Sequence, residues 1–309
     1  MGRRVWQVVG ASAATLLLLT GGEFAAFLAL LVHLLLPFPA AWVHMVHGPA
    51  AGGSVVGLSV ALFFLYSGIG AAGGYLLQFG IGSFCLPWLL RRNWPWDRAV
   101  VVTLAVVAIG SAVVFGAVAF QQGKGINGLA ASQVEAQLAE GKRLSEATAL
   151  SLEQRAELEA VLEWGAGFIR RAYPALALVS HGMILLFVVL LLNRAPGVKG
   201  LMAGSEFRHW SVSPWLIWFL IAGGFGFVLG RDPVQTVALN LLVVVVPIYF
   251  LQGLAIVAFF FWKKSVGPWV RGLGYFMAVT LNPLPMLVTG LGIFDLWIGF
   301  RKPRIREKE

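Results

Sequence analysis

Long apolar runs, separated by short polar loops, recur from one end of the chain to the other. Their approximate ranges are 7–36, 55–66, 71–90, 99–120, 175–192, 210–230, 234–262 and 274–304. Apolar segments of about 18 residues or more are typical of helices that cross a lipid bilayer. The pattern therefore predicts an all-α fold, a polytopic transmembrane helical bundle with about eight crossings.

The last apolar run is interrupted by the sequence Asn282-Pro283-Leu284-Pro285. Two prolines two positions apart do not fit into one unbroken helix, because each lacks an N–H and crowds the preceding turn. We expect two short helical pieces around a polar break, which forms either a hairpin or the wall of a site. Such a break is tolerated at membrane depth where protein or a water-filled cavity satisfies the freed backbone groups.

Small residues spaced four apart suggest places where helices approach closely. Gly70 and Gly74 form one such pair, and Gly226 and Gly230 form another. Pairs of this kind let the backbones of neighbouring membrane helices come together. We therefore expect tight helix packing at both.

The only long polar region of the sequence, residues 121–163, contains half of the chain's acidic residues. Ser132-x-x-Glu135 and Ser151-x-x-Gln154 are typical of capping boxes at helix starts. Apolar side chains at helical spacing give each predicted helix one apolar face. These positions are Val134, Leu138, Leu158, Val161 and Leu162. We expect a short external amphipathic helical pair, whose second helix continues into the next span with a kink at Pro174.

Basic residues gather in the loops that flank the apolar runs. They lie at the N-terminus and in 91–98, 194–208, 263–271 and 301–308. The excess of Lys and Arg in cytoplasmic loops places both termini in the cytoplasm and the acidic region outside. The expected parts are N-terminal transmembrane helices (1–120), the external insert (121–165), C-terminal transmembrane helices (166–300) and a basic cytoplasmic tail (301–309).

Composition agrees with a membrane protein. Charged residues make up 12% of the chain, whereas soluble domains contain about 25%. The net charge of +9 comes from the basic loops, so we expect the lipid bilayer as a partner and no nucleic acid. The single cysteine, Cys85, excludes an internal disulfide and a cysteine-based zinc cluster.

Five polar residues in or beside apolar runs are candidate substrate-binding residues. They are Glu23, Asn240, Gln252, Asn282 and Asp295. A carboxylate at the centre of a bilayer costs about 3 kcal/mol, so Glu23 either belongs to a site or lies near an interface or a partner helix. Asp295 either belongs to a site or caps or pairs near the cytoplasmic surface, since Arg301 follows closely. We expect these groups to line a small hydrated cavity between the first and last segments, because they are too polar to face lipid.

The histidines do not indicate a metal site. His44 and His47 would share a helical face, but no carboxylate or cysteine accompanies them at ligand spacing. We interpret them, with His33, as interfacial, and His181 as a core histidine. The sequence also lacks a nucleophile elbow and shows no other enzyme signature. We therefore expect no catalytic residue, metal or cofactor, and we do not expect an enzyme.

Five stretches, taken in order, resemble the YybS-like predicted membrane proteins of bacteria, a family with no established function. They are LLPFPAAWVHMVHG, QFGIGSFCLPWLLRR, FRHWSVSPWLIWFLI, VVVVPIYFLQGLAI and NPLPMLVTGLGIFDLWIGFRK. The resemblance covers most of the chain except 121–163. It implies a multi-pass protein of the bacterial cytoplasmic membrane. That family is distantly similar to the substrate-binding subunits of energy-coupling-factor vitamin transporters and to the rod-shape scaffold protein MreD.

Two functions follow from these features. Broken helices, small-residue packing and the distant resemblance favour a small-solute-binding or transport component with a small-molecule ligand. The external amphipathic pair and the lack of chemistry favour a membrane scaffold that binds a membrane or envelope protein. A polar cavity at mid-membrane would favour the first function. A solid core with an exposed apolar external groove would favour the second.

Overall fold

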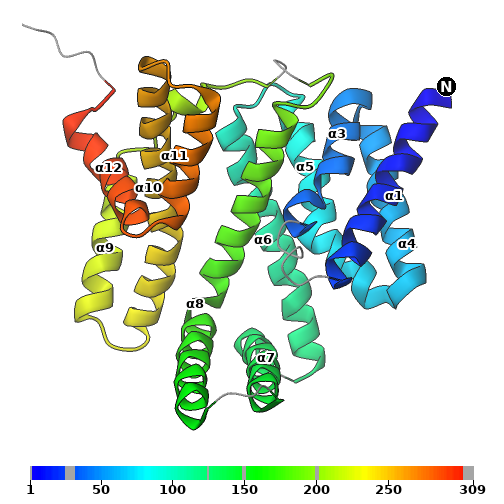
Figure 1. Ribbon diagram of the computed structural model, residues 1–309. Coiled ribbons are helices and arrows are strands. Elements are labelled where there is room, and N and C mark those ends of the chain that lie inside the picture. Colours follow the sequence, from blue (N-terminus) through cyan, green and yellow to red (C-terminus); the bar gives the residue numbers. More distant parts are fainter. Residues whose placement is uncertain (1, 25–31, 124, 148–150, 199–201, 302–309) are drawn as a thin grey trace, which may run out of the picture. The chain divides into compact units, whose positions relative to one another are not determined.

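The computed structural model describes residues 2–24, 32–123, 125–147, 151–198 and 202–301 (Figure 1). Within these residues all regular structure is helical, so the predicted all-α membrane bundle is confirmed. The chain divides into two units. Unit 1 comprises Met1–Leu129 and Ser180–Gly204, and unit 2 comprises Ala130–Val179 and Ser205–Glu309.

Unit 1 is built mainly from the helices of the first part of the chain. They are α1 (Gly2–Phe24), α3 (Phe38–His47), α4 (Pro49–Tyr75), the π-helix η1 (Leu76–Gly80), α5 (Ile81–Leu90) and α6 (Trp96–Gln121). The end of α8 (Leu152–Leu192) also belongs to this unit. The largest core cluster joins α3, α5, α6 and the end of α8 through fully buried side chains such as Leu86, Leu90 and Leu192.

Helix α4 folds back on itself at Gly68. Gly68 has φ 79° and ψ −173°, a conformation that only glycine adopts readily. The rings of Phe63 and Tyr75 lie 4.7 Å apart, whereas these positions would be about 18 Å apart along a straight helix. Farther from the bend at Gly68, a Cβ placed on Gly80 would lie 3.2 Å from the side chain of Val56. The two apolar runs on either side of Gly68 are therefore antiparallel arms that pack on each other.

The predicted close approach at Gly70 and Gly74 is wrong for the described residues, because a Cβ placed on either glycine meets no atom within 4 Å. The tight contact of unit 1 lies instead at Gly52, where an added Cβ would be 2.4 Å from the Cβ of His44. Helices α3 and α4 therefore touch almost backbone to backbone. A glycine pair in a sequence does not indicate which face of its helix meets a neighbour.

Polar contacts tie together one end of unit 1. Arg91, which follows α5, donates to the carbonyl of Met45 near the end of α3 (2.5 Å). The indole of Trp42 donates to the carbonyl of Pro196 (3.1 Å). His47, at the end of α3, is hydrogen-bonded to Gln7 in the first turns of α1. Arg91 therefore holds the start of the basic loop against the end of α3, which is itself bonded to α1.

Unit 2 is organised around α10 (Val234–Lys263), which packs against α9 (Leu216–Leu229) and α12 (Leu284–Ile298). A Cβ placed on Gly226 would lie 3.0 Å from the Cβ of Ala238 on α10, so one member of the second predicted glycine pair does form a close helix contact. The closest crossing, between α10 and α12, uses glycines that the sequence analysis did not single out. A Cβ on Gly253 would lie 1.9 Å from the carbonyl oxygen of Val288.

The last apolar segment is broken as predicted. Helix α11 (Pro268–Thr280) and helix α12 are bent by 96° at the break that contains Asn282 and Pro283. Leu281 ends α11 in an extended conformation (φ −95°, ψ 106°). The two short helices lie beside each other in unit 2 (Figure 1).

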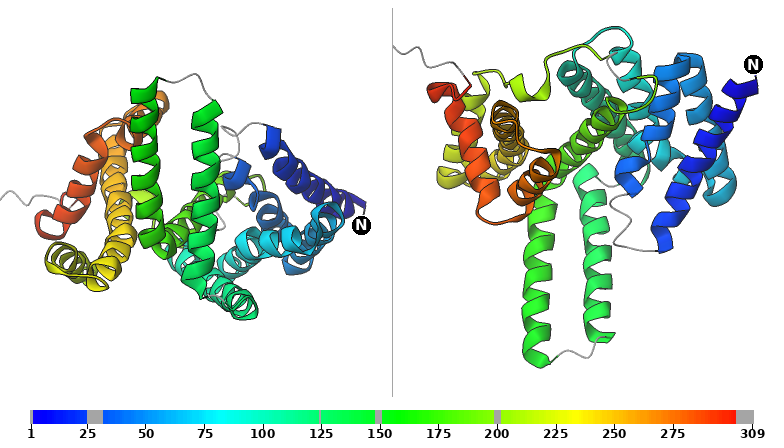
Figure 2. Two further views of the ribbon diagram at one scale, coloured as in Figure 1. Left: turned by 90° about the horizontal axis from the view of Figure 1, so that it is seen from below. Right: turned by 45° about the horizontal axis from the view of Figure 1, so that its top comes forward.

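Helix α7 (Ile126–Ala147) and the first part of α8 form the predicted helical pair (Figure 2), and its external location stays a prediction. The capping box before α8 is confirmed, because Ser151 N donates to Gln154 Oε1 (3.1 Å) and Gln154 N donates to Ser151 Oγ (3.2 Å). The other predicted box is wrong, since Ser132 lies inside α7 rather than at its start. Helix α8 continues through Pro174 to Leu192, as expected.

Among the described residues, four helices are long and apolar enough to cross a membrane, or five if α11 and α12 form one bent span. Two shorter apolar helices, Val5–Leu18 and Leu216–Leu229, accompany them. The stretch Pro49–Leu90 counts as one of the four. Its fold at Gly68 divides it into two arms of roughly twenty residues, each about 30 Å long, enough to cross a bilayer. About eight crossings require both arms, the bent pair and both shorter helices to cross, and this number stays a prediction.

Candidate functional site

A buried polar cluster in unit 2 joins two of the five candidate residues. Asp295 in α12 accepts a hydrogen bond from the amide of Gln252 in α10 (3.3 Å). It also accepts one from the guanidinium of Arg301 (2.6 Å). The side chains of Asp295 and Arg301 are only 8% and 13% exposed. Asp295 therefore pairs with Arg301, as one of its two interpretations expected.

The backbone after α12 brings this ion pair together. Gly299 adopts the left-handed conformation (φ 58°) that commonly ends a helix, and its N–H donates to the carbonyl of Asp295. The turn brings the N–H of Phe300 onto Asp295 Oδ1 (3.0 Å). It also lets Arg301 donate to the carbonyl of Trp210 (2.7 Å). The sharp turn after α12 thus allows Arg301 to form an ion pair with Asp295, which lies only six residues earlier.

The polar groups of the cluster are used within the chain. The amide oxygen of Gln252 accepts a hydrogen bond from the backbone N–H of Val212 (3.1 Å). The charge of Asp295 is balanced by Arg301, and Arg301 also bonds two backbone carbonyls. A buried ion pair needs such extra hydrogen bonds to offset the loss of water. The geometry therefore ties α10, α12 and the segment around Trp210 together.

Asn240, the third candidate, bonds to the kink of α8. Its Nδ2 donates to the carbonyl of Arg171 (2.7 Å), and its Oδ1 accepts the N–H of Ala175 (3.1 Å). In a regular helix these two backbone groups bond each other. Pro174 lies between them and disturbs the ladder, because it lacks an N–H and crowds the preceding turn. The amide of Asn240 bridges the two backbone groups and connects α10 to α8.

We predict that Asn240→Ala lowers the free energy of unfolding by about 2 kcal/mol, because the part-buried N–H of Ala175 and the carbonyl of Arg171 lose their side-chain partner. Gln235→Ala is a matched control, since Gln235 on α10 makes one exposed hydrogen bond, to the carbonyl of Phe227 on α9. Its loss should cost about 0.5 kcal/mol. Thermal and urea unfolding in detergent would measure both. In a Pro174→Ala background the effect of Asn240→Ala should shrink, because the helix can then close its own ladder. Equal effects in both backgrounds would contradict this role.

The two other candidates are not part of this cluster. Asn282 is exposed at the break between α11 and α12. Glu23 lies in the last turn of α1, but its side chain is outside the described residues. Asn240 and Gln252 are about 18 Å apart along α10. The expected cavity between the first and last segments therefore stays a prediction, and the structure brings together only Gln252 and Asp295.

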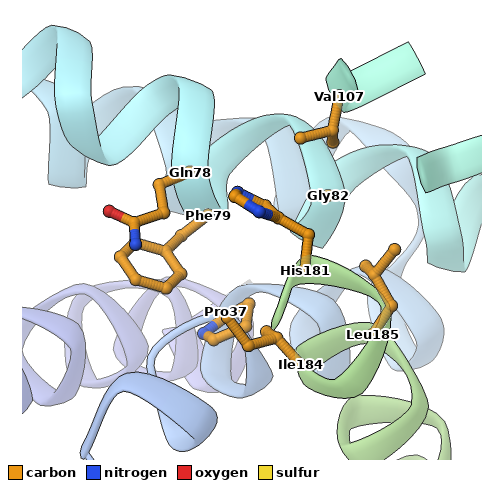
Figure 3. Close-up of a pocket in the computed structure, with 8 residues that line it drawn as sticks. All are labelled: Pro37, Gln78, Phe79, Gly82, Val107, His181, Ile184 and Leu185. Carbon is orange, nitrogen blue, oxygen red and sulfur yellow. The ribbon is translucent and has the colours of Figure 1, made fainter. Parts of the chain in front are cut away.

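Unit 1 contains a small pocket beside the π-helix η1, drawn in Figure 3. Its walls come from Pro37, Gln78, Phe79, Gly82, Val107, His181, Ile184 and Leu185. A π-helix inserts one extra residue per turn and is frequent at functional sites. The cavity volume is about 10 Å³, close to the minimum for one water molecule. His181, expected as a core histidine, thus lines a space that fits a water molecule and no organic solute.

His44 is completely buried between Gly52 and the ring of Phe84, whose centroid lies 4.9 Å from that of the imidazole. Neither ring nitrogen has a hydrogen-bond partner among the described residues. The same residues contain no group of three or more His, Cys, Asp or Glu side chains that could hold a metal ion. His44 is therefore a packing residue at the contact between α3 and α4.

Sequence reasoning left open whether Asp295 pairs with Arg301, and it missed Gln78 as part of a π-helix. The sequence showed Arg301 as a nearby cation. Its guanidinium reaches Asp295 only because the chain turns back at Gly299, which has a left-handed conformation. The position of Asn240 had one available signal, because the predicted kink at Pro174 implied freed backbone groups that needed a partner. The π-helix has no signal in the spacing of apolar residues.

Helices long and apolar enough for a bilayer define an all-α integral membrane protein. The chain belongs to a family described as "Predicted membrane protein (DUF2232)", whose model matches residues 12–296. This agrees with an uncharacterised membrane family, as the five sequence stretches indicated. No curated protein and no solved structure is significantly similar to the chain.

Proposed function

We propose that this protein is a membrane scaffold whose α7–α8 hairpin binds a helix of another protein. The observation that carries the proposal is an apolar stripe on α8, formed by the exposed Val161 and Trp164 and the partly buried Phe168. Spacings of three and four place them on one helix face. Trp164 is 74% exposed and Val161 59% exposed. The rings of Trp164 and Phe168 are stacked with centroids 6.1 Å apart.

The hairpin supports this stripe from the other side. Lys142 on α7 forms an ion pair with Glu163 on α8 (2.6 Å), and this hydrogen bond raises the pKa of Lys142. A Cβ placed on Gly141 would lie 3.5 Å from the side chain of Leu162. Leu162 thus faces α7, as the sequence predicted, while Val161 faces outward. The exposed side chains of Val161 and Trp164 therefore lie on a helix that a second helix holds in place.

Lipid is a poor partner for the stripe. The uncharged part of α8 runs from Ala175 to Leu192, which at 1.5 Å per residue matches a hydrocarbon core of about 30 Å. The headgroup layer adds only about 5–7 Å on each side. Along a continuous helix, Trp164 lies about 15 Å beyond Pro174. An aromatic side chain at that height is in water and gains free energy by binding protein.

Charge disfavours a second copy of the chain as the partner. Two copies in one membrane have their α8 helices pointing the same way, so a symmetric contact along the stripe is parallel. Glu157, one turn before Val161 and on the same face, would then lie against its own copy. Like charges in contact are unfavourable. A helix of a different protein, with a basic residue at the level of Glu157, fits better.

We predict that a photo-crosslinking amino acid at Trp164, in cells that make the protein, captures one protein partner of defined mass. The same amino acid at Glu159, on the other side of α8, serves as the control and should capture far less. Glu157→Lys should reduce the Trp164 crosslink at least fivefold, whereas Glu159→Lys should leave it unchanged, because only Glu157 lies on the stripe. Crosslinks to lipid or to a second copy, or equal effects of the two substitutions, would refute the scaffold proposal.

The pocket beside η1 is the observation that favours the second candidate, a small-solute-binding component. Its volume of about 10 Å³ fits a water molecule, so a solute would require the π-helix and the end of α8 to separate. Native mass spectrometry of the purified protein distinguishes the two candidates. A retained small molecule supports solute binding, and a retained protein supports the scaffold.

A further inference from the structure

One end of unit 2 carries positive charge that no nearby acid balances. Lys263 and Lys264 end α10, and Arg271 lies in the first turn of α11. The sequence has no acidic residue between Asp232 and Asp295. Asp295 is already neutralised by Arg301, and Glu206 is paired with Arg208. Neither lysine forms an ion pair with a described residue.

The turn between α10 and α11 has a defined shape. Ser265 adopts a left-handed conformation (φ 49°) and donates its N–H to the carbonyl of Trp262 (3.0 Å). Val266 donates to the carbonyl of Phe261 (3.0 Å). Arg271 folds back and donates from Nε to the carbonyl of Val266 (2.7 Å). The positive side chains of α10 and α11 are therefore presented on one short turn.

Two tryptophans flank the same turn. Trp262 is 47% exposed and Trp269 is 91% exposed. Both α10 and α11 are apolar as they leave the turn, so the turn lies at the level where hydrocarbon gives way to water. Tryptophan is enriched at this level of membrane proteins, and Lys or Arg beside it attracts anionic lipid.

We propose that this face, formed by Trp262, Lys263, Lys264, Trp269 and Arg271, binds the phosphate headgroup of an anionic phospholipid. The cations neutralise the phosphate. The exposed Trp269 ring packs against the glycerol and the upper acyl chains, a contact that a free phosphate ion would not use. This binding is independent of the scaffold role proposed for α8, since no residue is shared.

The basic loop of unit 1 differs from the two lysines of this face. Arg91 donates to the carbonyl of Met45, and the guanidinium of Arg92 lies 3.7 Å from the ring centroid of Trp88. These cations are already engaged within the protein. Lys263 and Lys264 instead extend from an exposed helix end and are available to a headgroup.

Native mass spectrometry of the full-length protein, stripped of lipid in a neutral detergent, tests the proposal. Phosphatidylglycerol is expected to bind about tenfold more tightly than phosphatidylcholine with the same acyl chains, and added salt should weaken this preference. Each lysine near an anionic headgroup accounts for about a fivefold change in affinity, so Lys263→Gln with Lys264→Gln should weaken phosphatidylglycerol binding roughly 25-fold.

The matched control removes two cations from the opposite end of unit 2. Arg170→Gln with Arg231→Gln lowers the net charge equally and should leave lipid affinity unchanged. Thermal unfolding shows whether both variants fold. Unchanged phosphatidylglycerol affinity after loss of the two lysines, or equal affinity for the two lipids, overturns the proposal. Displacement of the lipid by inorganic phosphate, at an ionic strength where chloride displaces none, assigns the face to a free anion and also overturns it.

Discussion

Arg301→Gln is expected to lower the free energy of unfolding by about 3–5 kcal/mol, because it leaves the buried carboxylate of Asp295 without a compensating charge. The side chain of Asp295 is 8% exposed and its bond to Arg301 is 2.6 Å long. The substitution also removes the donor to the carbonyl of Trp210. Urea or thermal unfolding in a fixed detergent would measure the loss.

A second ion pair of the same length provides the control. Lys142 and Glu163 are also 2.6 Å apart, but their side chains are 38% and 51% exposed. Water and salt screen such a pair, so Lys142→Gln should cost far less than Arg301→Gln. Adding Asp295→Asn to Arg301→Gln should recover part of the stability, since no unpaired charge remains. A loss at Arg301 as small as that at Lys142 would show that water reaches the Asp295 cluster.

Features set by short-range chemistry could be predicted from the sequence. The break at Asn282-Pro283 follows from the missing N–H groups and the crowding of the prolines, and α11 and α12 are separate helices there. The capping box at Ser151 follows from two side chains and two N–H groups within one turn, and both hydrogen bonds are present. Each prediction needed only neighbouring residues.

Features set by the meeting of distant segments could not be predicted in this way. Ser132 has the same box pattern as Ser151, but α7 extends beyond it at its start. Asn240 and Gln252 were both recognised as polar groups that need partners. Their partners, the kink of α8 and Asp295, depend on which helices adjoin α10. Recognising a polar residue at membrane depth therefore identifies a need for hydrogen bonds, and only tertiary structure shows whether a ligand or the chain itself meets it.

Close helix contacts show the same limit, because Gly70 and Gly74 match the expected pattern and meet nothing, whereas Gly253 and Gly292 form the tightest crossing. The residue spacing of a glycine pair says that a helix can be approached closely on that face. It does not say that a neighbour is there. What decides is whether an added methyl group would clash with a neighbouring helix. A glycine-to-alanine substitution tests this through its effect on stability.

Gly292→Ala is expected to destabilise unit 2 by about 3 kcal/mol. A Cβ at this position would lie 2.0 Å from the carbonyl oxygen of Tyr249 and 2.9 Å from the backbone N of Gly253. Both atoms belong to the backbone of α10, so no side chain can rotate away and the two helices must separate. Overpacking of this kind typically costs 1–3 kcal/mol, and a rigid backbone on both sides places the cost at about the upper end.

Gly290→Ala, on the same helix α12, is the matched control, because a Cβ there meets no atom within 4 Å. Without a clash, alanine should stabilise the helix by up to about 1 kcal/mol, since glycine is the poorer helix former. The two substitutions add the same methyl group two residues apart and should shift the unfolding midpoint in opposite directions. Similar shifts for both would mean that α10 and α12 are not in backbone contact. The hydrogen bond between Gln252 on α10 and Asp295 on α12 would then have to form without close packing of the two helices.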